Sequence, residues 1–243
     1  MNESPLILAL DTSHMKGSVA VARGEEILCE ILFDASDTHS ATLMPAVDVC
    51  LETAGVRFKD IDLFGVVSGP GSFTGLRIGM ATVKAFAAVC RRPVIPMLSL
   101  EVLAAAVPFA KSPVLPLIDA RRGEVYGGLY RTDDGLPGEL APPFSTGPGK
   151  VGEFLADAGI AGPVIVCGTG AARYEKVLSS VVPDGSFFSG PKWSVPSAAL
   201  VVVLALGKDP VPYAELPAIE PLYIRPPDAR LPAGSRLRRG GGE

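Results

Sequence analysis

Two segments that lie far apart in the chain begin in the same way, and this repetition limits the folds that the chain can adopt. Residues 8–19 contain an apolar strand that ends at Asp11, then a turn, a glycine and a second strand. Residues 116–125 repeat this order around Asp119. Short apolar runs that are bounded by turn residues are typical of buried strands. The repetition predicts two domains of related topology, and convergent use of aspartate and glycine at two unrelated hairpins is the alternative.

The rest of the chain alternates strand and helix patterns, with prolines at many of the joins. We predict strands over 6–10, 18–22, 27–33, 63–67, 94–97, 114–118, 125–130 and 164–167, and helices over 40–54, 71–90, 100–107, 151–158, 168–178 and 197–206. The stretch 135–149, which is rich in proline and glycine, is predicted as a loop. We divide the chain into an N-terminal domain (1–108), a related C-terminal domain (109–225) and a flexible tail (226–243) that holds few apolar residues.

The charge balance argues against a protein that binds nucleic acid by itself. The chain carries 22 basic and 26 acidic residues, a formal net charge of −4, while 48% hydrophobic residues supply ample core. A protein that binds DNA or tRNA alone needs a basic surface to displace counterions from phosphates. The arginines of the C-terminal segment either touch tRNA phosphates or remain solvated, and we favour the second reading: Arg225, Arg230, Arg236, Arg238 and Arg239.

The cysteines and the apolar runs indicate a cytoplasmic protein. Four cysteines stand apart in apolar surroundings without CxxC spacing, which is typical of reduced buried thiols: Cys29, Cys50, Cys90 and Cys167. The longest aliphatic run, residues 198–206, is far shorter than the ~20 residues that span a bilayer. An acidic residue near the N-terminus argues against a signal peptide. We therefore expect a cytoplasmic protein with no membrane partner.

The densest motif is SGPGSFTGLRIG at residues 68–79, which follows a predicted strand and opens a helix. Backbone N–H groups in such a place can hold an anion, but no Gly-Lys-Ser/Thr follows, so the motif is not a P-loop. Gly71, Gly75 and Gly79 recur every four residues on one side of the helix. A glycine inside a helix costs about 1 kcal/mol relative to alanine. We interpret the stripe as a surface that another backbone approaches closely.

The helix predicted over 71–90 is apolar around most of its circumference. It carries two apolar stripes, one of Phe73, Leu76, Met80, Val83, Ala87 and Cys90 and one of Ile78, Ala81, Ala85 and Val89. A helix of this kind must be covered on two sides. Its own sheet covers one side, and either a partner or the rest of the same chain covers the other. The sequence alone leaves both readings open.

Residues 68–79, together with LALDTS at 8–13, closely resemble the TsaB (YeaZ) family. The resemblance continues through His39-Ser40, 43–46, 99–103, 119–126 and 221–225, and it is loose over 132–163 and after 225. It implies an α/β fold of two domains in the actin-like ATPase and sugar-kinase class (ribonuclease H-like, with a duplicated core), in agreement with the repetition.

The resemblance also implies a non-catalytic subunit of the machinery that forms threonylcarbamoyladenosine in tRNA. Such a subunit pairs with its catalytic paralogue TsaD through helices of the first domain, or with itself when TsaD is absent. A TsaE-like ATPase and a TsaC-like enzyme that makes threonylcarbamoyl-adenylate complete the machinery, so tRNA is met only indirectly. We expect the partner interface at Leu43, Val47, Ser72, Phe73, Gly75, Leu76, Gly79, Met80 and Val83.

The number and spacing of the histidines indicate whether the chain can hold a catalytic metal ion. TsaD-like enzymes hold a metal with a His-x-x-x-His pair, which places both imidazoles on one helix face. This chain has only His14 and His39, in a predicted turn and before a helix. Neither has a nucleophile neighbour by motif, and no Gly-x-Ser-x-Gly elbow occurs. We therefore predict no catalytic residue and no metal site.

A nucleotide site is the remaining chemical candidate. Asp11 and Asp119 lie at the hairpin ends where this fold class places its phosphate-binding turns, and Gly168 and Gly170 match its adenosine segment. The first turn lacks tight glycines and the second carries arginine, so we interpret both as an inherited scaffold. We expect no tightly bound cofactor and leave ATP or ADP at the partner interface open. A stand-alone ATP-dependent phosphotransferase of the same fold class is the alternative function.

Overall fold

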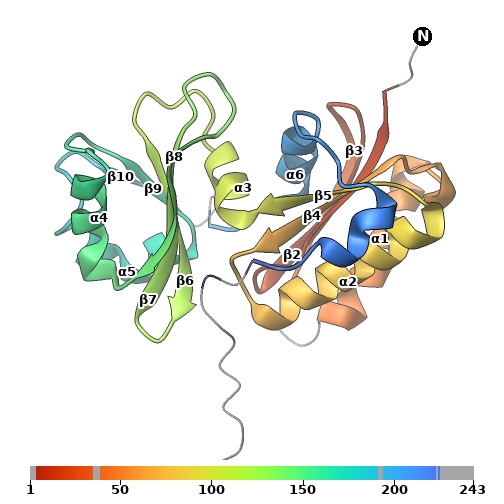
Figure 1. Ribbon diagram of the computed structural model, residues 1–243, viewed down its shortest axis with the longest axis horizontal. Coiled ribbons are helices and arrows are strands. Elements are labelled where there is room, and N and C mark those ends of the chain that lie inside the picture. The colour runs from red at the N-terminus through yellow and green to blue at the C-terminus, as the bar shows by residue number, and fades with distance from the viewer. Residues whose placement is uncertain (1–3, 35–38, 191–193, 223, 225–243) are drawn as a thin grey trace, which may run out of the picture.

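Two five-stranded sheets form the two halves of the protein (Figure 1). The computed structural model describes residues 4–34, 39–190, 194–222 and 224. The first sheet has the order β3-β2-β1-β4-β5. Its strands are β1 (Leu6–Asp11), β2 (Lys16–Arg23), β3 (Glu26–Asp34), β4 (Leu63–Gly69) and β5 (Val94–Leu98). The first three strands form an antiparallel meander, and β4 and β5 run parallel to β1.

The second sheet repeats this topology. Its order is β10-β9-β6-β7-β8, so β6, β7, β8, β9 and β10 stand where β1, β2, β3, β4 and β5 stand in the first sheet. The pairing directions also correspond, with β6-β7-β8 antiparallel and β9 and β10 parallel to β6. The strands are β6 (Val114–Arg121), β7 (Glu124–Arg131), β8 (Gly138–Thr146), β9 (Ile165–Cys167) and β10 (Phe187–Phe188). The repeated topology that the sequence predicts is therefore confirmed.

The six predicted helices are all present, with ends that shift by one or two residues. They are α1 (His39–Ala54), α2 (Phe73–Cys90), α3 (Ser99–Ala105), α4 (Val151–Asp157), α5 (Thr169–Leu178) and α6 (Ala198–Ala205). Short 3₁₀ helices are η1 (Phe58–Asp60), η2 (Pro148–Lys150) and η4 (Tyr213–Ala218). The sequence predicts neither strands β8 and β10 nor these 3₁₀ helices. β8 is an edge strand that contains Pro142 and Pro143, which an edge position tolerates.

Strand alternation divides the core of the first half into two layers. Leu8 and Leu10 of β1 point to one face, where α1 and α2 cover them, because successive side chains of a strand alternate between faces. Ile7 and Ala9 point to the other face and pack against α6. Figure 1 shows α1 and α2 together on one side of the first sheet and α6 on the other.

The chain returns to the first sheet after it completes the second. Val201 and Val202 of α6 join the core around Ile7, and Leu216 and Ile219 join the core on the α2 side. Part of the segment that we assigned to the C-terminal domain therefore packs on the first sheet. The division near residue 108 falls between α3 and β6 and stays a prediction about domains. The predicted tail, with its arginines, lies outside the described residues.

Helix α3 joins the two halves. Leu100 and Leu103 pack against Val114 and Ile118 of β6, whereas Val102 belongs to the core of the first sheet. Figure 1 shows α3 between the two sheets. The two halves therefore share a packed helix in addition to the connecting chain.

Candidate functional site

Several apolar side chains of α1 and α2 are exposed. On α1, Met44 is 42% and Val49 is 52% exposed, and on α2, Phe73 is 37% and Val89 is 79% exposed. Ala81, Ala85 and Ala88 continue the exposed side of α2. Large apolar side chains that gather on one surface mark interaction sites more often than scattered ones do. We use "the outer face" for these seven residues.

An aromatic–arginine pair lies at the start of this surface. The guanidinium carbon of Arg77 lies 3.9 Å from the centre of the Phe73 ring. The two residues are one helical turn apart, which places their side chains on the same face of α2. Aromatic and arginine side chains are enriched among the residues that dominate protein–protein affinity. Of the predicted interface residues, Phe73 belongs to the outer face, and Ser72 caps the helix by accepting a hydrogen bond from Gly75 N at 3.4 Å.

Most of the predicted interface residues are buried in the chain's own core instead. Leu43 and Val47 of α1 and Leu76, Met80 and Val83 of α2 are 3% exposed or less, and Gly75 and Gly79 are also buried. These seven residues are therefore not exposed to a partner in this structure, and their place at a partner interface stays a prediction. The sequence does not show which of the two apolar stripes of α2 faces the sheet. Leu76, Met80, Val83 and Ala87 face inward. Phe73 of the same stripe is exposed, as are Ala81, Ala85 and Val89 of the other.

The glycine stripe serves a contact within the chain. A Cβ atom at Gly79 would overlap Thr12 Oγ1, and one at Gly71 would overlap the backbone of Ser13. Thr12 Oγ1 donates a hydrogen bond to the carbonyl oxygen of Gly75 at 2.7 Å. The close approach that we predicted is therefore made by the turn after β1 and not by a partner.

This turn holds a buried polar cluster beneath the start of α2. Ser13 N donates to Asp11 Oδ1 at 2.8 Å, and Ser13 Oγ lies 2.8 Å from His14 Nδ1. Burial raises the pKa of Asp11 from 3.8 to about 7, because the charged carboxylate loses its hydration, although Ser13 opposes the shift. Burial lowers the pKa of His14 to about 4 for the same reason. Asp11 Oδ2 and His14 Nε2 have no hydrogen-bond partner among the described residues.

Ser13 and His14 of this cluster form a serine–histidine contact. The sequence motifs did not indicate it, because catalytic serine and histidine residues are usually far apart in the sequence. A hydrolytic serine needs a histidine within hydrogen-bond reach and access to a substrate. Ser13 is 1% and His14 is 8% exposed, so a substrate does not reach them in this structure. The contact therefore explains the packing of the turn and supplies no open nucleophile. The side chain of His39 lies outside the described residues.

The second aspartate is held by side chains of its own half. Asp119 Oδ1 accepts hydrogen bonds from Arg121 N at 3.0 Å and from the Tyr174 hydroxyl at 3.2 Å. Its Oδ2 lies 3.5 Å from Nε of Arg173. Asp11 is thus buried within its own turn, whereas Asp119 is engaged by its own turn and by two side chains of α5.

Gly168 and Gly170 have a packing role. A Cβ atom at Gly168 would overlap the carbonyl oxygen of Leu117, and the φ angle of +94° at Gly168 is one that other residues rarely adopt. A Cβ atom at Gly170 would lie 3.0 Å from the same carbonyl group. Both glycines therefore let the start of α5 pack closely on β6, and their link to a nucleotide site stays a prediction.

No group of three or more histidine, cysteine, aspartate or glutamate side chains in the described ranges could hold a metal ion. By length and composition, α2 is one helix of the described chain that could cross a membrane. Its inward stripe, however, is packed on the first sheet, as in the core helix of a globular domain.

Two sheets of the same strand order, each with an aspartate at or near the end of its first strand, give the chain the two-domain α/β fold that actin-like ATPases and sugar kinases share. Comparisons with known proteins narrow this class. The family described as "TsaD: tRNA N6-adenosine threonylcarbamoyltransferase" matches residues 33–142. The tRNA threonylcarbamoyladenosine biosynthesis protein TsaB of Bacillus subtilis is 29% identical over 219 residues, which are 90% of this chain and 93% of that protein.

Two further relatives match over nearly their whole length. An uncharacterized protein of Mycobacterium tuberculosis is 31% identical over 228 residues, 92% of this chain and 93% of its own. A crystal structure of a Pseudomonas aeruginosa protein, described as similar to peptidase YEAZ, superposes with a TM-score of 0.77 and 27% identity. That match covers 91% of this chain and 100% of the other. Over nearly its whole length the chain is thus similar to TsaB (YeaZ) proteins in both sequence and fold.

Proposed function

We propose that this protein is a non-catalytic subunit of the machinery that forms threonylcarbamoyladenosine in tRNA, and that the outer face of α1 and α2 binds a TsaD-like catalytic subunit. The relatives named TsaB support the pathway. The observation that carries the partner role is the outer face itself, because Val89 is 79% exposed on a helix whose other side is fully used by the core.

The chemistry of the outer face suits association with another protein. Complete burial of an exposed valine or methionine contributes about 1.5–3 kcal/mol, so a few such side chains can sustain a specific complex. The small side chains of Ala81, Ala85 and Ala88 let a partner helix approach α2 closely. In the absence of a TsaD-like subunit, the same surface would pair with a second copy of this chain.

The polar turns support a subunit without its own catalysis. Asp11 is buried with a pKa of about 7, and Asp119 is held by Arg173 and Tyr174. Neither carboxylate is placed to bind a phosphate-bound metal ion in this arrangement. We therefore assign the transfer reaction to the TsaD-like partner, with a TsaE-like ATPase as a further member, and expect tRNA to be bound mainly by the complex.

Substitutions on the outer face test the proposal. Val89→Asp places a charge on the exposed stripe of α2, and Val203→Asp makes the same change on α6, where the valine is 38% exposed. We expect Val89→Asp to weaken binding of the TsaD-like subunit about tenfold or more in sedimentation velocity, and to lower tRNA modification in the reconstituted reaction. Val203→Asp should bind like the wild type, and circular dichroism should be native for both.

If Val89→Asp binds the partner as tightly as the wild type, the outer face is not the interface. Calorimetry with ATP and magnesium on the isolated chain examines the alternative of a stand-alone phosphotransferase. Micromolar binding that Asp11→Ala abolishes would favour that enzyme and count against the subunit.

A further inference from the structure

A pocket of about 270 Å³ lies where the two halves meet beside α3. Its walls include Leu98 at the end of β5 and Pro137 before β8, and its polar lining is Glu101, Tyr130, Glu139 and Lys208. Val114 pairs with Tyr130 at one end of the β6–β7 ladder, and Arg121 pairs with Glu124 at the other. The pocket therefore lies at the opposite end of the second sheet from the Asp119 turn, and the function proposed above does not use it.

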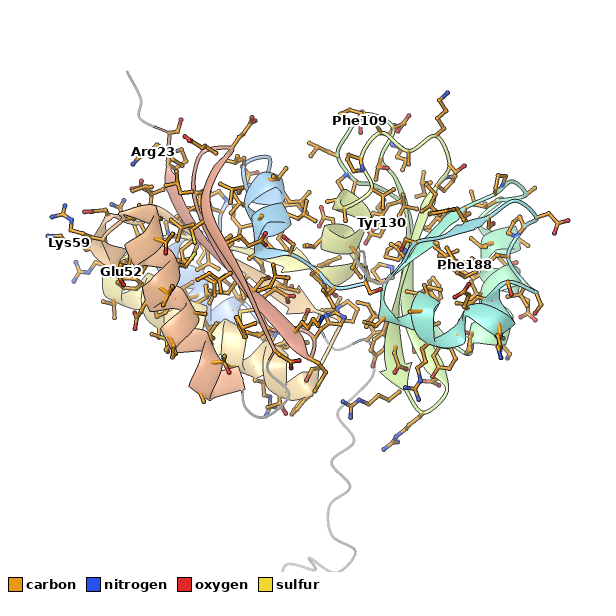
Figure 2. The ribbon with its side chains drawn as sticks, turned by 180° about the vertical axis from the view of Figure 1, so that it is seen from behind. Arg23, Glu52, Lys59, Phe109, Tyr130 and Phe188 are labelled. Atoms are coloured by element: carbon orange, nitrogen blue, oxygen red, sulfur yellow. The ribbon has the colours of Figure 1, made fainter. Side chains whose placement is uncertain are left out.

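The tyrosine is the first unusual feature of this pocket. Tyr130 is 2% exposed, and its hydroxyl has no hydrogen-bond partner in the part of the chain that the structure describes. Burial raises its pKa, and the nearby carboxylates of Glu101 and Glu139 raise it further, so the phenol stays protonated. Figure 2 labels Tyr130 between the two halves. A buried hydroxyl without a partner costs free energy, and Tyr130 is one of the residues that line this pocket.

The charges of the lining are the second feature. Lys208 Nζ lies 2.7 Å from the carboxylate of Glu101, so these two charges neutralise each other. Glu139 has no ion-pair partner among the described residues and lies on β8 directly opposite Tyr130 in the strand register. The lining thus carries two carboxylates and one ammonium, and its net charge is negative. The free carboxylate and the free phenol stand on adjacent strands.

We propose that this pocket binds a small amine that carries a primary ammonium group and a neighbouring hydroxyl. The ammonium group pairs with Glu139, and the hydroxyl exchanges a hydrogen bond with Tyr130. The volume is near the lower end of the range for ligand pockets, which suits a molecule much smaller than a nucleotide. Phosphates are disfavoured by the negative lining. An amino acid is disfavoured because its carboxylate group would find no free cation. The Lys208 ammonium is already paired with Glu101.

Calorimetry on the full-length chain tests the ligand class with three probes of similar size. We expect 1-aminopropan-2-ol to bind at one saturable site, propane-1,2-diol to give no saturable binding, and alanine to bind at least about tenfold more weakly than the amine. Equal binding of the diol and the amine would overturn the assignment of an ammonium group. No saturable binding of the amine would overturn the site.

Two variants locate the binding in this pocket. Glu139→Gln removes the free carboxylate and should weaken binding of 1-aminopropan-2-ol about tenfold or more. Glu153→Gln makes the same change at an exposed position of α4 outside the pocket lining and should leave binding unchanged. Tyr130→Phe keeps the ring and should weaken binding severalfold. If Glu139→Gln binds like the wild type, the proposal fails, while the subunit role tested through α2 stands unaffected.

Discussion

Gly79 gives the sharpest test of how the turn after β1 packs on α2. The substitution Gly79→Ala adds a Cβ atom that overlaps Thr12 Oγ1 in the present arrangement. Thr12 must then move, and its hydrogen bond of 2.7 Å to the carbonyl oxygen of Gly75 is lost. Thr12 is 1% exposed, so its hydroxyl would lack both this partner and water.

The magnitude follows from three opposing effects. An unsatisfied buried hydroxyl costs about 1–3 kcal/mol, and overpacking a tight contact costs about 1–3 kcal/mol. Alanine favours the helix over glycine by about 1 kcal/mol. We expect a net loss of about 2–3 kcal/mol in the free energy of unfolding, and a fall in Tm of about 5–10 °C.

Urea denaturation and differential scanning calorimetry measure this loss. Gly162→Ala is the matched control, because a Cβ atom there meets no atom within 4 Å. The double variant Thr12→Ala/Gly79→Ala should recover part of the loss, since the nearest remaining Thr12 atom, its Cβ, lies at 3.5 Å. If Gly79→Ala is as stable as the wild type or more stable, the reasoning about this contact is refuted.

Three further predictions concern the two polar turns and the packing at the start of α5. Burial raises the pKa of Asp11 from 3.8 to about 7, so the stability that its protonated form contributes is present below about pH 4 and lost as the pH rises through 7. Asp11→Asn does not ionise and escapes this loss. In urea titrations between about pH 4 and pH 8, this variant should gain up to about 4 kcal/mol in the free energy of unfolding relative to the wild type. Gly168→Ala should destabilise by about 2 kcal/mol or more in thermal unfolding, through overlap with Leu117 and its positive φ, and a neutral result would contradict the packing role. Tyr174→Phe should cost about 1 kcal/mol or less, and a double-mutant cycle with Asp119→Asn should assign that cost to their hydrogen bond.

The sequence was sufficient for the topology because the signals were local and repeated. Apolar runs, turn residues and the recurrence around Asp11 and Asp119 define most strands and all six helices. β8 escaped prediction because Pro142 and Pro143 dominate its composition, and an edge position makes them tolerable. The two-residue strand β10 is too short to produce any periodic signal.

The functional surface was harder to predict because it depends on orientation. Two apolar stripes of α2 are equivalent in the sequence, and the burial of Leu76, Met80 and Val83 in the folded chain shows which side faces inward. The same limit applies to the pocket, whose polar residues come from α3, β7, β8 and the segment after α6. No local motif links Tyr130 with Lys208, so only the folded chain brings them together.

Hydrogen–deuterium exchange of this chain, alone and mixed with its TsaD-like paralogue, tests the central claim most directly. The claim is that the outer face of α1 and α2 is the partner surface. We predict slower exchange over 41–49 and 73–89 in the mixture, with little change over the second sheet. Slower exchange confined to residues 114–188, or none at all in a mixture that forms a complex, would contradict the account.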